Sequence, residues 1–202
     1  FGVLAAIPWR MLRRRTRLVH WCHDLYPEAP IAEGMVRESS ITVRVLKRFL
    51  AAAYRRCDVI ADLGSCMRDL LAKYSSPAKQ VTLTPWALVE PTAPVAVDTT
   101  TRAELFGDAQ LGLLYSGNFG RAHGYAEFLD LARAVRGESI RLCFAGRGNR
   151  IDELKNAVTT DDANVSFAGF APESVLEKRL GAGDLHLVSL NPALEGLIVP
   201  SK

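Results

Sequence analysis

The sequence predicts an α/β protein made of two parts, each with a parallel β-sheet. Three observations support this fold class. Short apolar runs alternate with amphipathic helical segments, the composition changes abruptly between residues 89 and 101, and the alternation then starts again. Hydrophobic residues make up 49% of the 202 residues and charged residues 23%, which is typical of a globular protein with a substantial core and excludes a mainly disordered chain.

The first part, residues 1–88, is expected to hold three strands joined by helices. Residues 18–22 (LVHWC) form an apolar run that predicts a buried strand. Between Glu38 and Arg56, apolar residues recur at helical spacing against arginines and a lysine, which predicts an amphipathic helix. The other expected elements are a strand at 59–61, a helix at 67–74 with Ser65 as its N-cap, and a strand at 81–83.

A linker and a second part follow. Residues 89–101 (VEPTAPVAVDTTT) contain prolines and three consecutive threonines without a helical period, so residues 89–108 are interpreted as an interdomain linker and its lead-in. The second part, residues 109–202, is expected to carry four parallel strands, at 111–116, 140–145, 165–167 and 185–190, with helices at 125–135, 151–158 and 173–180. Sheets of this type usually carry about five or six strands, so this part is expected to be incomplete.

Charge and cysteines limit the possible partners. The net charge of +3 conceals a basic patch near the start of the chain, formed by Arg10, Arg13, Arg14, Arg15 and Arg17. Such a patch attracts anionic lipid headgroups or is the solvated face of a helix, and the lack of interleaved aromatic residues disfavours nucleic acid. The apolar residues 1–8 are too few to span a bilayer. No CxxC spacing occurs, which favours a reducing, cytoplasmic compartment over a zinc site or a disulfide framework at Cys22, Cys57, Cys66 and Cys143.

Two glycine-rich turns follow neighbouring strands of the second part. The first, residues 116–124, reads SGNFGRAHG, and the second, residues 145–150, reads AGRGNR. Glycine lets backbone amides approach a ligand, the following helix presents its positive end, and Arg121 adds a charge suited to a diphosphate. The alternative is that the glycines only allow tight turns. A dinucleotide site is disfavoured because the first turn lacks GxGxxG spacing, although Arg147 suits the phosphate of NADP.

Polar residues at strand ends are the candidate catalytic groups. His23 and Asp24 follow the first strand, and a histidine beside an acid acts as acid, base or hydrogen-bond donor near neutral pH. The alternative for this pair is local capping of the following turn. His20 and His186 lie inside predicted strands and are interpreted as core histidines. Glu195 follows the last strand, where it either accepts hydrogen bonds from sugar hydroxyls or is a solvated loop acid.

Seven segments in a fixed order resemble family 4 retaining glycosyltransferases of the GT-B fold, above all bacterial members that build cell-surface polysaccharides. They are WCHDLYPE, AAAYRRCDVIADLGSCMRDLLAKY, the linker, LLYSGNFGRAHG, CFAGRGNRIDEL, VSFAGF and HLVSLNPALEGLIVPSK. The resemblance covers nearly the whole chain. It implies two Rossmann-like domains with parallel sheets, both incomplete here: the end of an acceptor-side domain (1–88) and the start of a domain that binds a nucleotide-diphosphate sugar (109–202).

The resemblance also implies roles, residue by residue. His23 matches the histidine-bearing cleft turn of the acceptor domain, with Asp24 beside it as the second candidate catalytic residue. The residues expected to bind the donor are Gly117, Asn118, Gly120, Arg121, His123, Gly146, Arg147, Glu195 and Lys202. Many relatives have lysine where His123 stands, and Lys202 is expected to supply the missing charge. Glu195 matches the first acid of an EX7E pattern whose second acid would fall at position 203.

The implied reaction moves a sugar from the nucleotide-diphosphate donor to a saccharide or lipid-linked acceptor, with retention of configuration, in polysaccharide or glycolipid biosynthesis. Basic side chains and helix ends stabilise the leaving diphosphate in such enzymes, so no metal or other cofactor is expected. The implied location is the cytoplasm, with the basic patch on the inner face of the membrane. Because both domains are incomplete, these residues are expected to turn over no substrate by themselves. A non-catalytic sugar-nucleotide-binding relative and a sugar-nucleotide epimerase are the alternatives.

Overall fold

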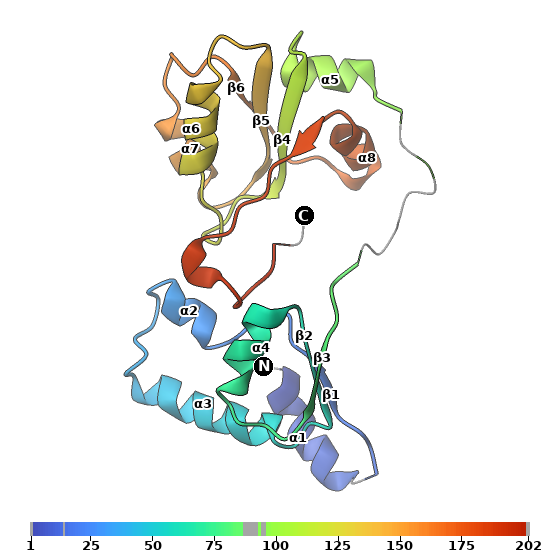
Figure 1. Ribbon diagram of the computed structural model, residues 1–202, viewed down its shortest axis with the longest axis vertical. Coiled ribbons are helices and arrows are strands. Elements are labelled where there is room, and N and C mark those ends of the chain that lie inside the picture. The colour runs from blue at the N-terminus through green and yellow to red at the C-terminus, as the bar shows by residue number, and fades with distance from the viewer. Residues whose placement is uncertain (1, 14, 87–92, 94–95, 201–202) are drawn as a thin grey trace. The chain divides into compact units, whose positions relative to one another are not determined.

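The structure is a computed structural model and describes residues 2–13, 15–86, 93 and 96–200 (Figure 1). The chain divides into two compact units. Unit 1 comprises Phe1–Leu88 with Pro192–Val199, and unit 2 comprises Val89–Asn191 with Pro200–Lys202. Each unit contains a parallel sheet, so the predicted α/β fold with parallel sheets is confirmed.

Unit 1 is built on a three-stranded parallel sheet in the order β1-β2-β3. The strands are β1 (Val19–Trp21), β2 (Val59–Asp62) and β3 (Lys79–Thr82). The helices are α1 (Gly2–Leu12), α2 (Glu28–Ala32), α3 (Ile41–Tyr54), α4 (Ser65–Ala72) and the 3₁₀ helix η1 (Pro192–Leu194). The core consists of apolar side chains from strands and helices, among them Leu25, Leu50, Tyr54, Ile60, Met67 and Leu71.

The strands and the two helices expected in the first part are present, but some ends differ. The strand expected at 81–83 is Lys79–Thr82, and the helix expected at 67–74 is Ser65–Ala72. Ser65 is the first residue of α4, and the N-cap is Gly64. The carboxylate that holds this turn comes from Asp62 at the end of β2, because its Oδ1 accepts a hydrogen bond from the Gly64 amide at 3.1 Å. The sequence analysis does not predict α1, α2 or η1.

Residues 192–199 depart from the expected domain bounds, which place them in the second part. In the structure they group with unit 1. The Leu25 amide donates to the Leu197 carbonyl at 2.9 Å, and the side chains of Leu194 and Leu197 are buried. Backbone pairing and apolar burial therefore hold this segment on unit 1.

Unit 2 contains a four-stranded parallel sheet in the order β6-β5-β4-β7, which confirms the four parallel strands expected here. The strands are β4 (Leu111–Asn118), β5 (Ile140–Arg147), β6 (Val165–Ala168) and β7 (Leu185–His186). The helices are α5 (Thr99–Phe106), α6 (Ala126–Ala134), α7 (Ile151–Ala157) and α8 (Glu173–Gly181).

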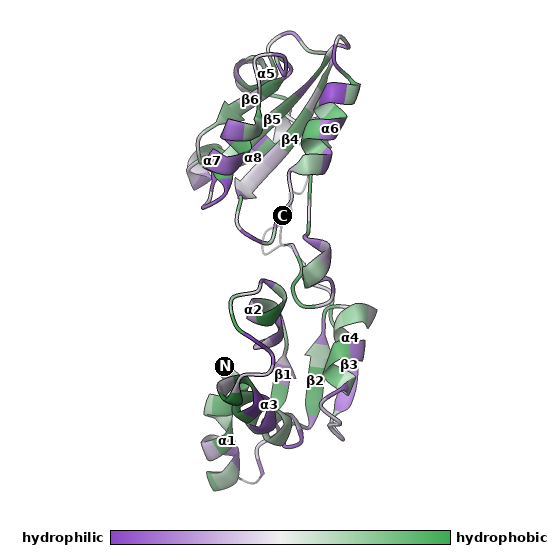
Figure 2. Ribbon diagram, turned by 90° about the vertical axis from the view of Figure 1, so that its left-hand side faces the viewer, coloured by the Kyte–Doolittle hydropathy of each residue, from purple (hydrophilic) through white to green (hydrophobic). Residues whose placement is uncertain are grey.

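Helices cover both faces of the unit 2 sheet (Figure 1). On one face, α6 and α7 pack on Tyr115 and Phe144. On the other face, α5 packs on Leu114 and Cys143. Adjacent strand residues thus point to opposite layers, as the two-residue period of a strand requires. Figure 2 shows hydrophobic and hydrophilic residues alternating along α6, as expected of a helix with one face on a sheet.

Three expectations for unit 2 are wrong. The helix α5 begins at Thr99, inside the segment interpreted as a linker, because Asp98 caps it by accepting a hydrogen bond from the Thr101 amide at 2.8 Å. The last strand ends at His186 rather than at residue 190, and the His186 side chain is exposed, so it is not a core histidine. None of the helices in the described part of the chain is both long and apolar enough to cross a membrane.

Candidate functional site

The two glycine turns lie side by side at the carboxyl edge of the unit 2 sheet. The parallel pairing of β4 with β5 runs to their last residues, with Gly117 beside Gly146 and Asn118 beside Arg147. A Cβ atom on Gly146 would stand 1.9 Å from the carbonyl oxygen of Gly117. Only glycine therefore lets the ends of these two strands approach so closely.

The first turn is fixed to the second by its backbone. The Phe119 amide donates to the Arg147 carbonyl at 2.6 Å, and the Phe119 carbonyl accepts from the Arg150 amide at 3.2 Å. The Arg150 guanidinium also donates to the His123 carbonyl at 2.9 Å. Since the Phe119 side chain is fully buried in the core beside α6, the turn has a rigid base.

The segment after β7 holds the other side of this turn. The Asn191 amide donates to the Ala122 carbonyl at 2.7 Å, and the Ser189 hydroxyl donates to the Gly124 carbonyl at 3.0 Å. His123 is buried, and its Nδ1 lies 2.7 Å from the Ser189 carbonyl, which can only accept, so Nδ1 carries the proton. The His123 ring thus bonds to the protein backbone.

The tip of the first turn presents backbone donors. For the amides of Gly120, Arg121 and Ala122, no hydrogen-bond acceptor is recorded in the described part of the chain. The Arg121 side chain is exposed beside them, and α6 begins at Ala126. Consecutive amide donors, a cationic side chain and a helix N-terminus together form an electropositive site suited to a phosphate group.

A cavity of about 640 Å³ adjoins the end of β4 in unit 2. Its wall includes Ser116, Gly117 and Asn118 of the strand end and the exposed His186. Apolar side chains form the rest of the wall. They come from α8 and the segment before it (Phe170, Ala171, Leu176 and Leu180), from β4 and β5 (Leu114 and Ala145) and from the segment after β7 (Leu187 and Val188). Sequence reasoning missed Phe170, whose ring lies 4.3 Å from the Arg147 guanidinium in a cation–π contact, because nothing local marks an aromatic after β6 as functional.

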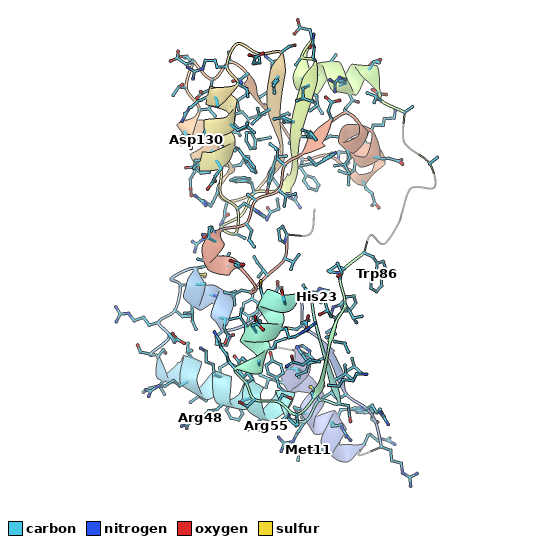
Figure 3. The ribbon with its side chains drawn as sticks, in the orientation of Figure 1. Met11, His23, Arg48, Arg55, Trp86 and Asp130 are labelled. Carbon is cyan, nitrogen blue, oxygen red and sulfur yellow. The ribbon has the colours of Figure 1, made fainter. Side chains whose placement is uncertain are left out.

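His23 and Asp24 follow the carboxyl end of β1 in unit 1, and both side chains are exposed. The His23 ring lies 4.5 Å from the Trp21 ring, which stacks at 5.5 Å on the exposed ring of Trp86 (Figure 3). Between His23 and Asp24 themselves the structure records no hydrogen bond. This edge therefore offers an imidazole, a carboxylate and an aromatic face.

Two neighbours of His23 are unsuited to acid–base chemistry. Burial raises the pKa of the Cys22 thiol to about 12, so a nucleophilic thiolate is disfavoured there. Burial lowers the pKa of His20, whose half-buried ring stacks on Tyr54 at 5.6 Å. His20 is therefore held as a neutral packing residue.

The remaining expected donor ligands lie elsewhere. Glu195 is an exposed residue of unit 1, where its Oε1 accepts a hydrogen bond from the Cys66 thiol at 3.6 Å. The following Gly196 has a φ of +72°, and a Cβ there would stand 2.9 Å from the Cys66 carbonyl carbon. Lys202 and Arg14 lie outside the described residues. Their predicted roles, like those of the other site residues, stay predictions.

Known proteins resemble this chain in sequence and in fold. No family model matches the chain. Over 183 residues, the sequence is 28% identical to a probable glycosyltransferase, WbjE, of Pseudomonas aeruginosa, in a match that covers 89% of this chain and 46% of that protein. The chain thus spans about half the length of the curated relative that it matches.

Solved structures share the fold. HepE of Anabaena, in complex with UDP, superposes with a TM-score of 0.63 at 13% identity over 91% of this chain and 49% of its own. Sucrose-phosphate synthase of Thermosynechococcus elongatus gives a TM-score of 0.58 at 19% identity over 89% of this chain and 46% of its own. The chain has the fold of GT-B glycosyltransferases. The predicted GT-B fold class is therefore confirmed.

Within this GT-B fold, the two candidate edges belong to different units. The glycine turns and the cavity belong to unit 2, and the group of His23, Asp24 and Trp86 belongs to unit 1. Among the described residues, no three histidine, cysteine, aspartate or glutamate side chains gather where they could hold a metal ion.

Proposed function

We propose that this chain is part of a glycosyltransferase that moves a sugar from a nucleotide-diphosphate donor to a saccharide or lipid-linked acceptor. The observation that carries the proposal is the row of amides at Gly120, Arg121 and Ala122, beside an exposed arginine, at the carboxyl edge of a GT-B unit. HepE was solved with UDP and with UDP-glucose, which supports a sugar nucleotide as the donor. The WbjE likeness supports the transferase class.

The proposed reaction uses unit 2 for the donor and unit 1 for the acceptor. The bond between the anomeric carbon and the donor phosphate oxygen breaks, and a bond from the same carbon to an acceptor hydroxyl oxygen forms. The acceptor hydroxyl gives up its proton, and the diphosphate leaves with the bonding electrons. The amides of the first turn and Arg121 stabilise the charge that develops on that diphosphate.

Finer assignments follow the resemblance to family 4. We propose retention of anomeric configuration, a hexose as the transferred sugar, and a place in polysaccharide or glycolipid biosynthesis. The proposed location is cytoplasmic and peripheral to the inner face of the membrane, with the patch Arg10–Arg17 near anionic lipid. In that patch, Arg10 lies 3.8 Å from Asp58 and Arg13 lies over the Trp9 ring, so these two charges are already engaged.

Arg121→Ala tests the donor site. In the natural protein we expect the Kd for the sugar nucleotide to rise roughly tenfold to a hundredfold, because one charge-assisted contact with phosphate, worth about 1.5–3 kcal/mol, is lost. Isothermal titration calorimetry measures this change. The matched control is Lys178→Ala, which removes an exposed charge in the last turn of α8 and is expected to leave the Kd unchanged. Equal affinities for both variants would remove the first turn from the donor site.

Chelation tests the expectation of metal independence. We expect the transfer rate of the natural protein to stay within about twofold in excess EDTA, because amide dipoles and arginine provide the charge that a metal otherwise supplies. The assay follows release of nucleoside diphosphate with both substrates present. Loss of activity that returns on addition of manganese would contradict the expectation. Release of diphosphate that requires no acceptor would favour hydrolysis, and conversion of the donor sugar would favour an epimerase.

A further inference from the structure

Helix α3 carries apolar side chains on the side that faces away from the core of unit 1. Its buried residues are Val43, Leu50, Ala53 and Tyr54. At about 100° per residue, Ile41, Val45 and Phe49 share one sector on the opposite side of the helix. Their side chains are 71%, 44% and 62% exposed, respectively. These three residues, the α3 ridge, form a line of apolar side chains two turns long.

Three arginines run beside the α3 ridge. Arg44, Arg48 and Arg55 occupy the adjoining sector of the helix and are exposed, and we call them the basic row. No ion pair or hydrogen bond from their side chains is recorded within the described ranges. The helix itself, ITVRVLKRFLAAAY, contains no acidic residue. The outer side of α3 therefore joins apolar contact area to uncompensated positive charge, which is the pattern of a helix at a membrane interface.

The nearby acids do not neutralise the basic row. Glu38 and Glu28 line a depression with Arg48 and Arg55, but they lie 2.9 Å and 3.7 Å from Lys47. Glu28 also accepts a hydrogen bond from the Tyr74 hydroxyl at 2.6 Å. Asp58, in the depression at the far end of the helix, lies 3.8 Å from Arg10. These pairs leave the charge of the row available to an external anion.

The end of α1 extends the same surface. Met11 lines one depression together with Arg55 and Arg56, and the side chains of Met11 and Leu12 are exposed. Figure 3 places Met11, Arg48 and Arg55 along one edge of unit 1. Figure 2 shows α1 and α3 near each other, each with hydrophobic and hydrophilic residues. Apolar and basic groups therefore continue beyond the α3 ridge.

We propose that the α3 ridge and the basic row dock unit 1 onto an anionic lipid bilayer. The apolar side chains enter the boundary between headgroups and acyl chains, and the guanidinium groups bind lipid phosphates. Charge complementarity favours an anionic bilayer as the partner of this surface. The basic row is positive and exposed, and its helix contains no acidic residue. The three apolar side chains of the ridge are too few to form the apolar centre of a stable protein interface, which buries about 800 Å² on each side.

This proposal goes beyond the transferase activity and does not depend on it. It also differs from membrane contact through the arginine charges of the patch Arg10–Arg17, which is electrostatic only. Charge without apolar insertion is screened as salt rises, because the Debye length shrinks to about 3 Å at 1 M. Apolar insertion is not screened, so the two modes of binding respond differently to salt.

The test measures binding of the natural protein to vesicles by co-sedimentation. The vesicles are pure phosphatidylcholine or a mixture of phosphatidylcholine with phosphatidylglycerol. Each basic residue near an anionic surface contributes about a fivefold factor, so Arg44→Gln with Arg48→Gln is expected to weaken binding to the mixed vesicles about 25-fold. The control, Lys155→Gln with Lys178→Gln, removes the same charge from exposed positions of unit 2 and is expected to change binding less than about threefold.

A second variant tests the apolar part. Val45→Ser with Phe49→Ser is expected to weaken binding roughly tenfold or more at both low and high salt. All of these positions are exposed, so the variants are expected to keep the wild-type melting temperature. Equal binding by the variant Arg44→Gln with Arg48→Gln and the lysine control, or equal binding to both vesicle types, would overturn the proposal. So would gel filtration that shows a dimer converted to a monomer by Val45→Ser with Phe49→Ser, since the ridge would then be an interface between copies.

Discussion

Gly146→Ala is expected to lower the melting temperature of the natural protein by about 5–10 °C and to abolish measurable binding of the donor. A Cβ at this position would lie 1.9 Å from the Gly117 oxygen and 3.0 Å from its carbonyl carbon. Both are backbone atoms of the paired strand, so rotation of a side chain cannot relieve the contact. The ends of β4 and β5 would have to separate, at a cost of about 3 kcal/mol.

The matched control for this variant is Gly169→Ala. Gly169 follows β6, which neighbours β5, and a Cβ there would meet nothing within 4 Å. We expect its melting temperature and donor affinity to stay close to those of the wild type. Differential scanning fluorimetry gives the first quantity and calorimetric titration the second. Donor binding by Gly146→Ala at wild-type affinity would contradict both the close approach of the strands and the place of this edge in the donor site.

These glycines show how a sequence pattern can be explained in two ways. The sequence analysis attributes both turns to close approach of a ligand, with tight turns as the alternative. The structure supplies a reason within the fold for Gly146 and for Gly148, where a Cβ would lie 2.1 Å from the Phe119 oxygen. At Gly120, by contrast, a Cβ would come no closer than 3.3 Å, to the Asn118 side chain. The pattern therefore marks the position of the turns without showing which glycine serves a ligand.

Local patterns predicted the elements better than their ends or their partners. The β-strands and α3 were predictable because burial on a sheet or on one helix side fixes the period of apolar residues. The start of α5 was missed because Asp98, its capping residue, was included in a threonine-rich linker. The contact of Glu195 with Cys66 joins residues 129 positions apart, and no local pattern carries that information.

His23→Ala is expected to lower the turnover of the natural protein about a hundredfold or more while leaving the Kd for the donor within about twofold. The reason is the division of roles proposed for the two units. His23 is an exposed side chain of unit 1 beside Trp21 and Trp86, on the proposed acceptor side, whereas the amides and Arg121 that bind the diphosphate belong to unit 2. Loss of the imidazole removes a positioned polar group from the reaction without removing a donor contact.

A conservative variant separates the two ways in which the imidazole can act. His23→Gln keeps a hydrogen-bonding side chain but cannot transfer a proton, so it is expected to recover turnover only if His23 positions a substrate hydroxyl. Rates at saturating donor and acceptor, paired with calorimetric titration of the donor, measure both effects, and an unchanged melting temperature serves as the control for folding. If His23→Ala abolishes donor binding while Arg121→Ala leaves it intact, the assignment of donor and acceptor to the two units is reversed.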